Sequence, residues 1–302
     1  MDNAKTYLLP ALWLSLIVSI TLTACGGSSD DTDEEPNENP RLGMIIPAYE
    51  WPDKTDPSNM WPKMASAAKK LGKKLIIAAN ANNGPGETIS ATYADAIRTT
   101  TLEGAVIIGY VATCYGNQSN PDPGRSLCPK TEGKIQVDVD RWYAFYPEVQ
   151  GIFYDQTSNK QEHVEYYRNL YSHAQGKNAS EQIVVNNTGL IPHKDYADIG
   201  SILVMTEDEH DEFVVEWKEP GVPPDWARGL NSSVMLFETP TTPTDAWRKA
   251  ADDAVADGAC WLFITHDGAD HNPWDSLPPW FDDMVNYVAD KDAPHCAAKK
   301  QG

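Results

Sequence analysis

The chain is poor in basic residues and lacks the short motifs of several enzyme classes. Its 302 residues include 24 Lys and Arg against 44 Asp and Glu, which gives a formal net charge of −20. A surface this acidic repels the phosphates of nucleic acids and of anionic lipids, so we expect no nucleic-acid partner. The sequence contains no glycine-rich phosphate loop and no Gly-x-Ser-x-Gly motif, which argues against a serine hydrolase. We therefore expect no cofactor.

The longest apolar stretch lies at the N-terminus, over residues 8–22. It is too short for a good membrane-spanning helix. It ends in Leu-Thr-Ala-Cys at residues 22–25, which resembles the lipobox of bacterial lipoproteins. The resemblance implies a signal peptide over residues 1–24 and a lipid on Cys25; the alternative is an ordinary signal peptide in which Cys25 is incidental. Because Gly26 rather than aspartate follows, it also implies the outer membrane of a bacterial cell envelope, contacted through the lipid anchor only.

Residues 25–40 contain six acidic residues, no basic residue and almost nothing apolar to bury. Such a segment cannot offset the entropy lost on ordering, so we expect a disordered acidic tether. The remaining residues, 41–302, are numerous enough for one large domain. The first 40 residues carry seven acids and one base, which leaves −14 of the −20 charge on that domain.

Cysteine is also scarce, with five residues in all. Once Cys25 is assigned to the lipid, an even number remains, and an even number in an exported protein favours disulfides. Pairing between sequence neighbours predicts the bonds Cys114–Cys128 and Cys260–Cys296. The cysteine spacing does not fit a metal site, and we expect no bound metal.

Short apolar runs alternate with helical patterns along the whole domain. Strands that are continuously apolar are typical of a parallel sheet covered by helices. Eight strand–helix units favour an α/β fold of the single-domain (β/α)8, or TIM-barrel, type. The expected strands are 42–47, 75–79, 105–111, 152–154, 183–185, 202–205, 234–237 and 261–264, and helical patterns lie within 61–71, 93–97, 137–145, 164–174, 213–217, 247–255 and 281–288.

Carboxylates, amides and aromatic rings follow these strands, at the end of the barrel where active residues lie. Asp155 ends the fourth strand and Glu207 follows the sixth, so both acids are expected in one cleft. Two such carboxylates are what cleavage of a glycosidic bond requires. The alternatives are a helix-capping role for Asp155 and a solvated loop for the acidic run 207–212. The candidates for substrate binding are Tyr49, Trp51, Asn80, Tyr110, Gln156, Asn186 and Glu238.

Several strand-end segments have a characteristic order and spacing between residues 42 and 207. They are Ile-Pro-Ala-Tyr (46–49) with Trp-Pro (51–52), Asn-Ala-Asn-Asn-Gly-Pro-Gly (80–86), Gly-Tyr-Val-Ala-Thr (109–113), Val-Asp-Arg-Trp (139–142) with Tyr-Pro (146–147), Gly-Ile-Phe-Tyr-Asp (151–155) and Val-Asn-Asn (185–187). As a set they resemble the spherulation-specific family 4 (spherulin-4-like) proteins. The resemblance implies a (β/α)8 barrel and, for the glycosidase members of the family, endo-hydrolysis of α-1,4-linked galactosamine polymers.

In that family the fourth strand ends in an Asp-Glu pair and the sixth in a Glu. Here Asp155 and Glu207 match, but Gln156 stands in place of the neighbouring glutamate. We predict Asp155 as nucleophile or stabiliser and Glu207 as general acid/base, acting on a cationic galactosamine polymer that suits an acidic cleft. Because a glutamine cannot donate a catalytic proton near neutral pH, the alternative is a non-catalytic carbohydrate-binding barrel.

Overall fold

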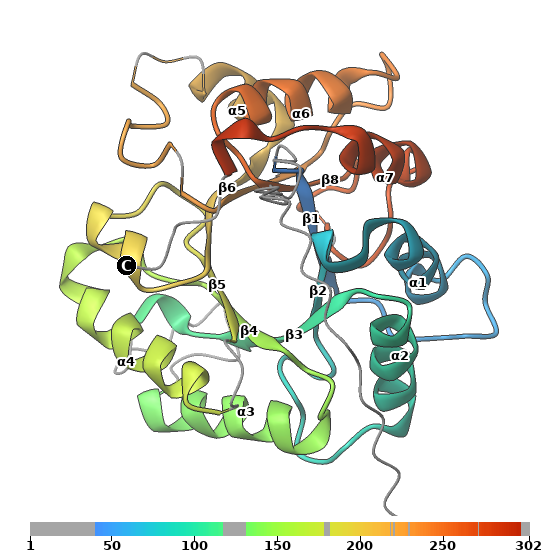
Figure 1. Cartoon of the computed structure of the whole chain (residues 1–302), viewed down its shortest axis with the longest axis vertical. Helices are drawn as coiled ribbons and strands as arrows, with labels where there is room; N and C mark the ends of the chain where they lie inside the picture. The colour runs from blue at the N-terminus through green and yellow to red at the C-terminus, as the bar shows by residue number, and fades with distance from the viewer. Residues whose placement is uncertain are drawn as a thin grey trace, which may run out of the picture. The chain divides into compact units, whose positions relative to one another are not determined.

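The computed structural model describes residues 40–116, 131–177, 182–217, 219, 221–228, 230–270 and 272–296. These residues form a closed barrel of eight parallel strands in sequential order, surrounded by helices (Figure 1). The predicted (β/α)8 fold is therefore confirmed. The predicted signal peptide, the lipidation site Cys25 and all but the last residue of the predicted tether lie outside the described residues. Among the described residues, no helix combines the length and apolarity needed to cross a bilayer.

The barrel strands are short and almost wholly buried. Every residue of the first three strands is buried, because the barrel interior covers one face and helices cover the other. The ring closes where Gly43 and Met44 pair with Trp261 and Leu262. The strands are β1 (Gly43–Ala48), β2 (Leu75–Ala79), β3 (Val106–Ala112), β4 (Gly151–Asp155), β5 (Ile183–Asn187), β6 (Ile202–Glu209), β7 (Ser232–Phe237) and β8 (Trp261–Ile264).

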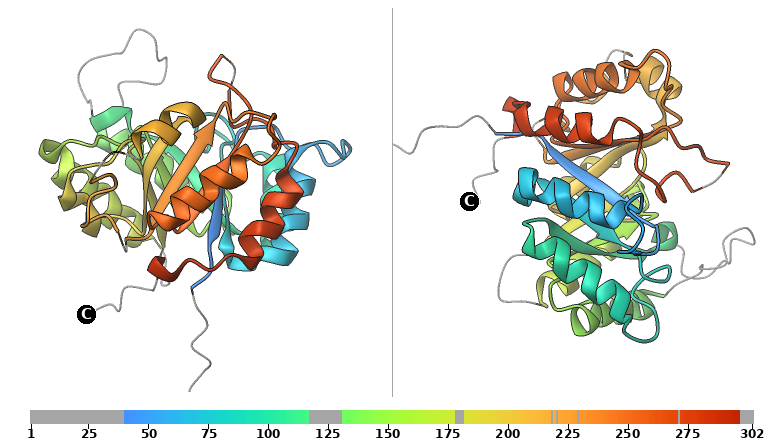
Figure 2. Two further views of the ribbon diagram at one scale, coloured as in Figure 1. Left: turned by 90° about the horizontal axis from the view of Figure 1, so that it is seen from above. Right: turned by 90° about the vertical axis from the view of Figure 1, so that its right-hand side faces the viewer.

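The helices pack around the outside of the barrel, as the two further views in Figure 2 show. Side-chain caps fix several of their starts: Asn59 accepts from the Trp61 N–H at the start of α1, and Ser90 accepts from the Tyr93 N–H at the start of α2. The α-helices are α1 (Met60–Leu71), α2 (Ala91–Leu102), α3 (Glu132–Phe145), α4 (Val164–Gln175), α5 (His210–Glu216), α6 (Ala246–Ala256) and α7 (Phe281–Asp290).

Two segments differ from the expected pattern. The link between β5 and β6 contains a 3-10 helix, Lys194–Asp198, in place of an α-helix. Strand β6 continues to Glu209, four residues beyond the expected end, so the alternative of a solvated loop does not hold for the first three acids of the acidic run. Glu207, Asp208 and Glu209 pair with Met235, Leu236 and Phe237 of β7, because backbone pairing satisfies these positions whatever their side chains.

A disulfide joins Cys260 and Cys296, whose Cα atoms lie 5.4 Å apart. It ties the 3-10 segment Pro294–Cys296 to the residue that precedes β8, so this predicted pairing is confirmed. The other predicted pairing, Cys114–Cys128, involves a cysteine outside the described residues and stays a prediction.

Helix α3 packs closely on β3 because residue 109 is a glycine. Gly109 lies against the indole of Trp142 from α3, and a Cβ atom at Gly109 would lie 2.4 Å from the Trp142 Cδ2 atom. The same indole donates its N–H to the carbonyl oxygen of Tyr110 at 2.8 Å. The packing of α3 on β3 therefore also fixes the strand at the residue that follows Gly109.

Prediction for Gly109→Ala. The added methyl group must displace Trp142 or the strand, so we expect a loss of about 1–3 kcal/mol in the free energy of unfolding, measured by denaturant titration. The control is Gly133→Ala in α3, where nothing lies within 4 Å of the added Cβ. That variant should be neutral or slightly more stable, since Ala favours helix over Gly. Equal losses in both variants would contradict the packing explanation.

Candidate active site

The two predicted carboxylates lie together near the C-terminal ends of β4 and β6, the two strands that flank β5. Asp155 is the last residue of β4, and Glu207 lies two residues before the end of β6. Both side chains are half-buried. Between them stands Asn187, the last residue of β5. Its Nδ2 atom donates to Asp155 Oδ1 at 2.9 Å and also to Glu207 Oε2. One amide nitrogen therefore bridges the two acids.

A phenol from β3 holds the other oxygen of Asp155. The Tyr110 hydroxyl donates to Asp155 Oδ2 at 2.8 Å. Burial raises the pKa of Tyr110 far above its ordinary value, and the negative charge of Asp155 adds to the effect. Tyr110 thus stays protonated over any ordinary pH range and remains a hydrogen-bond donor to this carboxylate.

An indole from the link between β8 and α7 approaches Glu207. Trp274 donates its Nε1–H to Glu207 Oε1 at 3.3 Å. The side chain of Trp274 is buried and packs against Phe263 of β8, with ring centroids 6.0 Å apart. Its carbonyl oxygen accepts the backbone N–H of Tyr49 at 3.1 Å, so this link is tied to the end of β1.

Tyr49 completes the group of aromatic residues beside the pair. Its ring meets that of Tyr110 edge to face, with centroids 5.3 Å apart. Burial raises the pKa of Tyr49 well above its ordinary value, and the charges of Asp155 and Glu207 raise it further. The structure therefore brings together four of the predicted site residues: Tyr49, Tyr110, Asp155 and Glu207.

Asn186 does not join this group, and the prediction that it binds substrate is corrected. Its side chain is buried, and its Nδ2 atom donates to the carbonyl oxygen of Ile199 at 2.6 Å. Successive side chains of a strand point to opposite faces, so Asn187 faces the carboxylates when Asn186 faces the helices. Sequence reasoning chose the wrong one of two adjacent asparagines.

Asn80 supports the loop that follows β2. Its Oδ1 atom accepts the N–H of Gly84 at 2.9 Å, and its carbonyl oxygen accepts the hydroxyl of Tyr93 at 2.7 Å. Both contacts order the backbone at the rim of the barrel. A direct contact of Asn80 with substrate stays a prediction.

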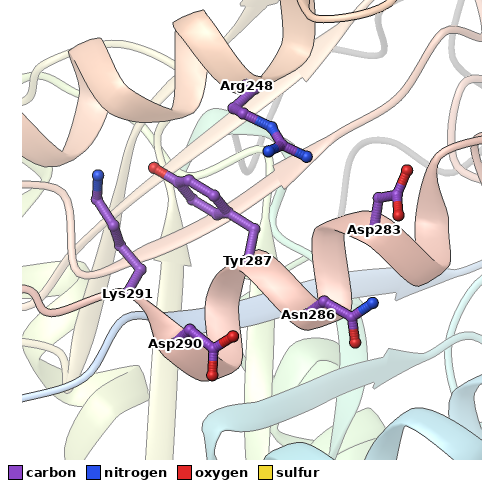
Figure 3. A pocket seen from close by; sticks show the side chains of 6 residues that line it. All are labelled: Arg248, Asp283, Asn286, Tyr287, Asp290 and Lys291. Atoms are coloured by element: carbon purple, nitrogen blue, oxygen red, sulfur yellow. The ribbon is translucent and has the colours of Figure 1, made fainter.

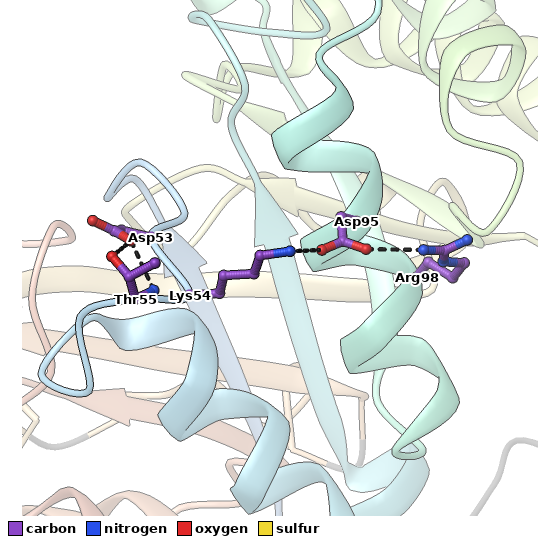
Figure 4. A network of polar contacts seen from close by, with 5 residues as sticks. All are labelled: Asp53, Lys54, Thr55, Asp95 and Arg98. Carbon is purple, nitrogen blue, oxygen red and sulfur yellow. Dashed lines mark hydrogen bonds and ion pairs between the residues drawn. The ribbon is translucent and has the colours of Figure 1, made fainter.

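Trp51 lies in the link between β1 and α1, and its side chain is 56% exposed. Its ring packs edge to face on Tyr93 of α2, with centroids 5.2 Å apart. Beyond it, Lys54 reaches Asp95 of α2 at 3.3 Å, and Asp95 also binds Arg98 (Figure 4). These contacts hold the link against α2 and leave the Trp51 ring available for stacking.

Gln156 and Glu238 each follow a strand in a left-handed backbone conformation, with φ values of 54° and 52°. This conformation is costly for residues other than glycine and often marks functional sites. The Gln156 carbonyl oxygen accepts the N–H of Tyr115 and the Thr113 hydroxyl, and Glu238 Oε1 accepts the N–H of Ala269 at 3.0 Å. Their predicted contacts with substrate stay predictions.

Cavities between helices outside the barrel include a small one of about 120 Å³ between α5 and α6 and two larger ones. One of about 330 Å³ is bounded by α6 and α7 and their ends (Figure 3). Another of about 690 Å³ lies between α1, α2 and the link that carries Lys54. None of these is lined by Asp155 or Glu207. Within the described part of the chain, no group of three or more His, Cys, Asp or Glu residues is placed to hold a metal ion.

The fold and the site define a class of protein: a (β/α)8 barrel with a bridged carboxylate pair at the C-terminal ends of its strands. The sequence profile of the family described as spherulation-specific family 4 matches residues 43–288, which include all eight strands. The chain belongs to this family.

The chain is similar to one curated protein in sequence and to several solved structures in fold. Spherulin-4 of Physarum polycephalum is 29% identical over 197 residues, which are 65% of this chain and 52% of that protein, so the alignment spans about half its length. The crystal structure of Aspergillus clavatus Sph3 in complex with GalNAc matches with a TM-score of 0.68 at 20% identity, over 83% of this chain and 98% of that chain. The exo-β-1,4-mannosidase Op5Man5 of Opitutaceae bacterium strain TAV5 matches with a TM-score of 0.51 at 8% identity, over 84% and 60%.

Prediction for Tyr110→Phe. A phenol that stays protonated in the fold but ionises in the unfolded chain stabilises the protein below the unfolded pKa of about 10, and this contribution is lost as pH rises above it. Tyr110 is such a phenol. Tyr110→Phe should reduce the fall in unfolding free energy between pH 10 and 12 by up to about 1.4 kcal/mol per pH unit, measured by denaturant titrations. Tyr115→Phe, at a side chain that is 46% exposed, is the control. If both variants keep the wild-type slope, Tyr110 is not held protonated by the fold.

Proposed function

We propose that the protein is a glycoside hydrolase that cleaves an amino-sugar polysaccharide. The observation that carries this proposal is the bridge from Asn187 Nδ2 to both Asp155 and Glu207. It places two half-buried carboxylates at the end of the barrel where such enzymes act. Two carboxylates beside aromatic rings are suited to a sugar, because the acids act on the glycosidic bond while rings stack on sugar faces.

The hydrogen bonds support different roles for the two acids. Asp155 accepts from the Tyr110 hydroxyl at 2.8 Å and from Asn187 at 2.9 Å, and both donors stabilise its ionised form. Glu207 shares the Asn187 amide, and its indole donor lies at a longer 3.3 Å. Asp155, whose ionised form the Tyr110 phenol stabilises, is therefore assigned as nucleophile, and Glu207 as general acid/base.

The proposed reaction has two steps. Glu207 donates its proton to the glycosidic oxygen while a carboxylate oxygen of Asp155 attacks the anomeric carbon, which breaks the glycosidic bond and forms a glycosyl ester. A water molecule then attacks the same carbon, Glu207 takes its proton, and the ester bond to Asp155 breaks. Both carboxyl groups return to their starting protonation states.

An amino-sugar polymer is the substrate class that the available observations favour. The domain carries most of the chain's charge of −20, and a polymer with free amines is cationic. Family membership supports the same choice, and the related Sph3 was crystallised with GalNAc. We propose a galactosamine polymer as the first substrate to test.

A second candidate function, a non-catalytic carbohydrate-binding barrel, is favoured by one residue. Gln156 follows Asp155 where the family resemblance implies a glutamate. An amide can hold a sugar hydroxyl but cannot transfer a proton near neutral pH. If that third acid is required for turnover, this chain binds the polymer without cutting it.

We also propose that the barrel is attached to a bacterial outer membrane by a lipid on Cys25. The support is the Leu-Thr-Ala-Cys sequence at residues 22–25, followed by the acidic segment up to residue 40. A charged segment of this kind extends itself by repulsion and separates the barrel from the lipid.

Prediction for Glu207→Gln. The substitution keeps the shape of the side chain but removes the transferable proton, so release of new reducing ends from a galactosamine polymer should fall by about 10²–10⁴-fold. Polymer binding, measured by affinity electrophoresis, should persist. Wild-type cleavage that survives in Glu207→Gln would refute the assignment, and binding by the wild type without any cleavage would select the second candidate.

Prediction for stereochemistry. N–H···O bonds span about 2.7–3.2 Å, so two oxygens bonded to one nitrogen lie at most about 6 Å apart. Retaining glycosidases have carboxyl groups about 5–5.5 Å apart, whereas inverting ones leave about 6.5–9.5 Å for a water. We expect the first product seen by proton NMR to keep the anomeric configuration of the cleaved bond. Initial appearance of the opposite anomer would contradict the mechanism.

A further inference from the structure

We propose that Asn187 is a positioning residue that sets the protonation of the carboxylate pair. The amide bridges Asp155 and Glu207, and it can neither gain nor lose a proton near neutral pH. Its significance for catalysis rests on the proposed function. Its effect on the proton affinity of the pair does not, because that effect can be measured without any substrate.

The orientation of the amide is fixed by a short turn. Asn187 Oδ1 accepts the N–H of Gly189 at 3.1 Å, so the NH₂ end of the same amide must face the acids. Gly189 has a left-handed φ of 65°, which glycine adopts without strain. The carbonyl oxygen of Gly189 in turn accepts the backbone N–H of Glu207 at 3.0 Å. One turn thus holds both the bridging amide and the strand that carries the general acid.

The amide resolves a conflict between the two acids. Two carboxylates this close repel each other, and unless they are separated such a pair tends to share a proton. Asn187 Nδ2 occupies the place between them and donates to both. The two acids are therefore kept from sharing one proton, so Asp155 can stay ionised while Glu207 gains and gives up a proton of its own.

Three phenols lie near the pair and keep their protons near neutral pH. Tyr49 from β1 and Tyr110 from β3 have pKa values raised far above the ordinary value by burial. Burial raises the pKa of Tyr167 from α4 to about 12. On β6 itself Asp208 follows Glu207, and it contacts Glu212 of α5. The residue at position 187 touches both Asp155 and Glu207.

The decisive variant is Asn187→Asp. It keeps the size of the side chain, removes the N–H donors and adds a third carboxylate, so Asp155 and Glu207 should hold their protons to higher pH. The measurement is the pH titration of the ¹³C carboxyl signals, assigned with Asp155→Asn and Glu207→Gln. We expect at least one midpoint to rise by a pH unit or more, a tenfold change in proton affinity.

The matched control is Asn286→Asp on the exposed side of α7, where the same charge is added outside the barrel. Its titration should match that of the wild type. Midpoints that are unchanged in Asn187→Asp, or that shift equally in Asn286→Asp, would overturn the proposal. If Asn187→Asp fails to fold, Gly189→Ala, which strains the turn that orients the amide, takes its place. That variant should shift a midpoint in the same direction, and unchanged midpoints would again overturn the proposal.

Activity provides a separate arm of the experiment. If the wild type cleaves the polymer, Asn187→Asp should lower kcat by about 10²–10³-fold at the wild-type optimum and move the pH profile to higher pH, with a smaller change in KM. Asn187→Ser, which keeps one donor, should recover part of the rate without the pH shift. If the wild type does not cleave the polymer, the proposed function fails, while the titration still decides the role of Asn187.

Discussion

The order of strands in the barrel is the constraint on which the site depends. β5 pairs with β4 on one side and with β6 on the other, and Asn187 at the end of β5 pairs with Val204, three residues before Glu207 on the longer strand β6. This arrangement brings Asp155 and Glu207 to the same side-chain amide, that of Asn187. At a separation of about 5 Å and an effective dielectric constant of about 20, two such charges repel by about 3 kcal/mol. The donors around them, Asn187, Tyr110 and Trp274, offset this repulsion.

The fold, and the acids in the site, could be predicted from the sequence because both follow from short-range pattern. Continuous apolar runs mark buried parallel strands, and Asp155 and Glu207 directly follow such runs. The choice between Asn186 and Asn187 could not be made, because every residue of β5 from Val184 is buried and no alternation reveals which face is inward. Trp274 was missed because it reaches Glu207 from a long link whose course depends on tertiary contacts.

Contacts of the Gln156 backbone hold the chain directly after Asp155. Gln156 holds a left-handed φ of 54°, and its carbonyl oxygen is fixed by the Tyr115 N–H at 2.6 Å and the Thr113 hydroxyl at 2.9 Å. These contacts involve the backbone of Gln156, so they do not depend on whether its side chain ends in an amide or an acid. The backbone that carries Asp155 is therefore held by contacts that do not involve the side chain of Gln156.

The most direct test is a crystal structure of the Glu207→Gln variant with a bound galactosamine oligosaccharide. The account predicts a sugar across the strand ends, with its anomeric carbon about 3–3.5 Å from an oxygen of Asp155 and the glycosidic oxygen within hydrogen-bond distance of residue 207. An oligosaccharide bound only elsewhere, such as in the cavity between α1 and α2, would contradict it.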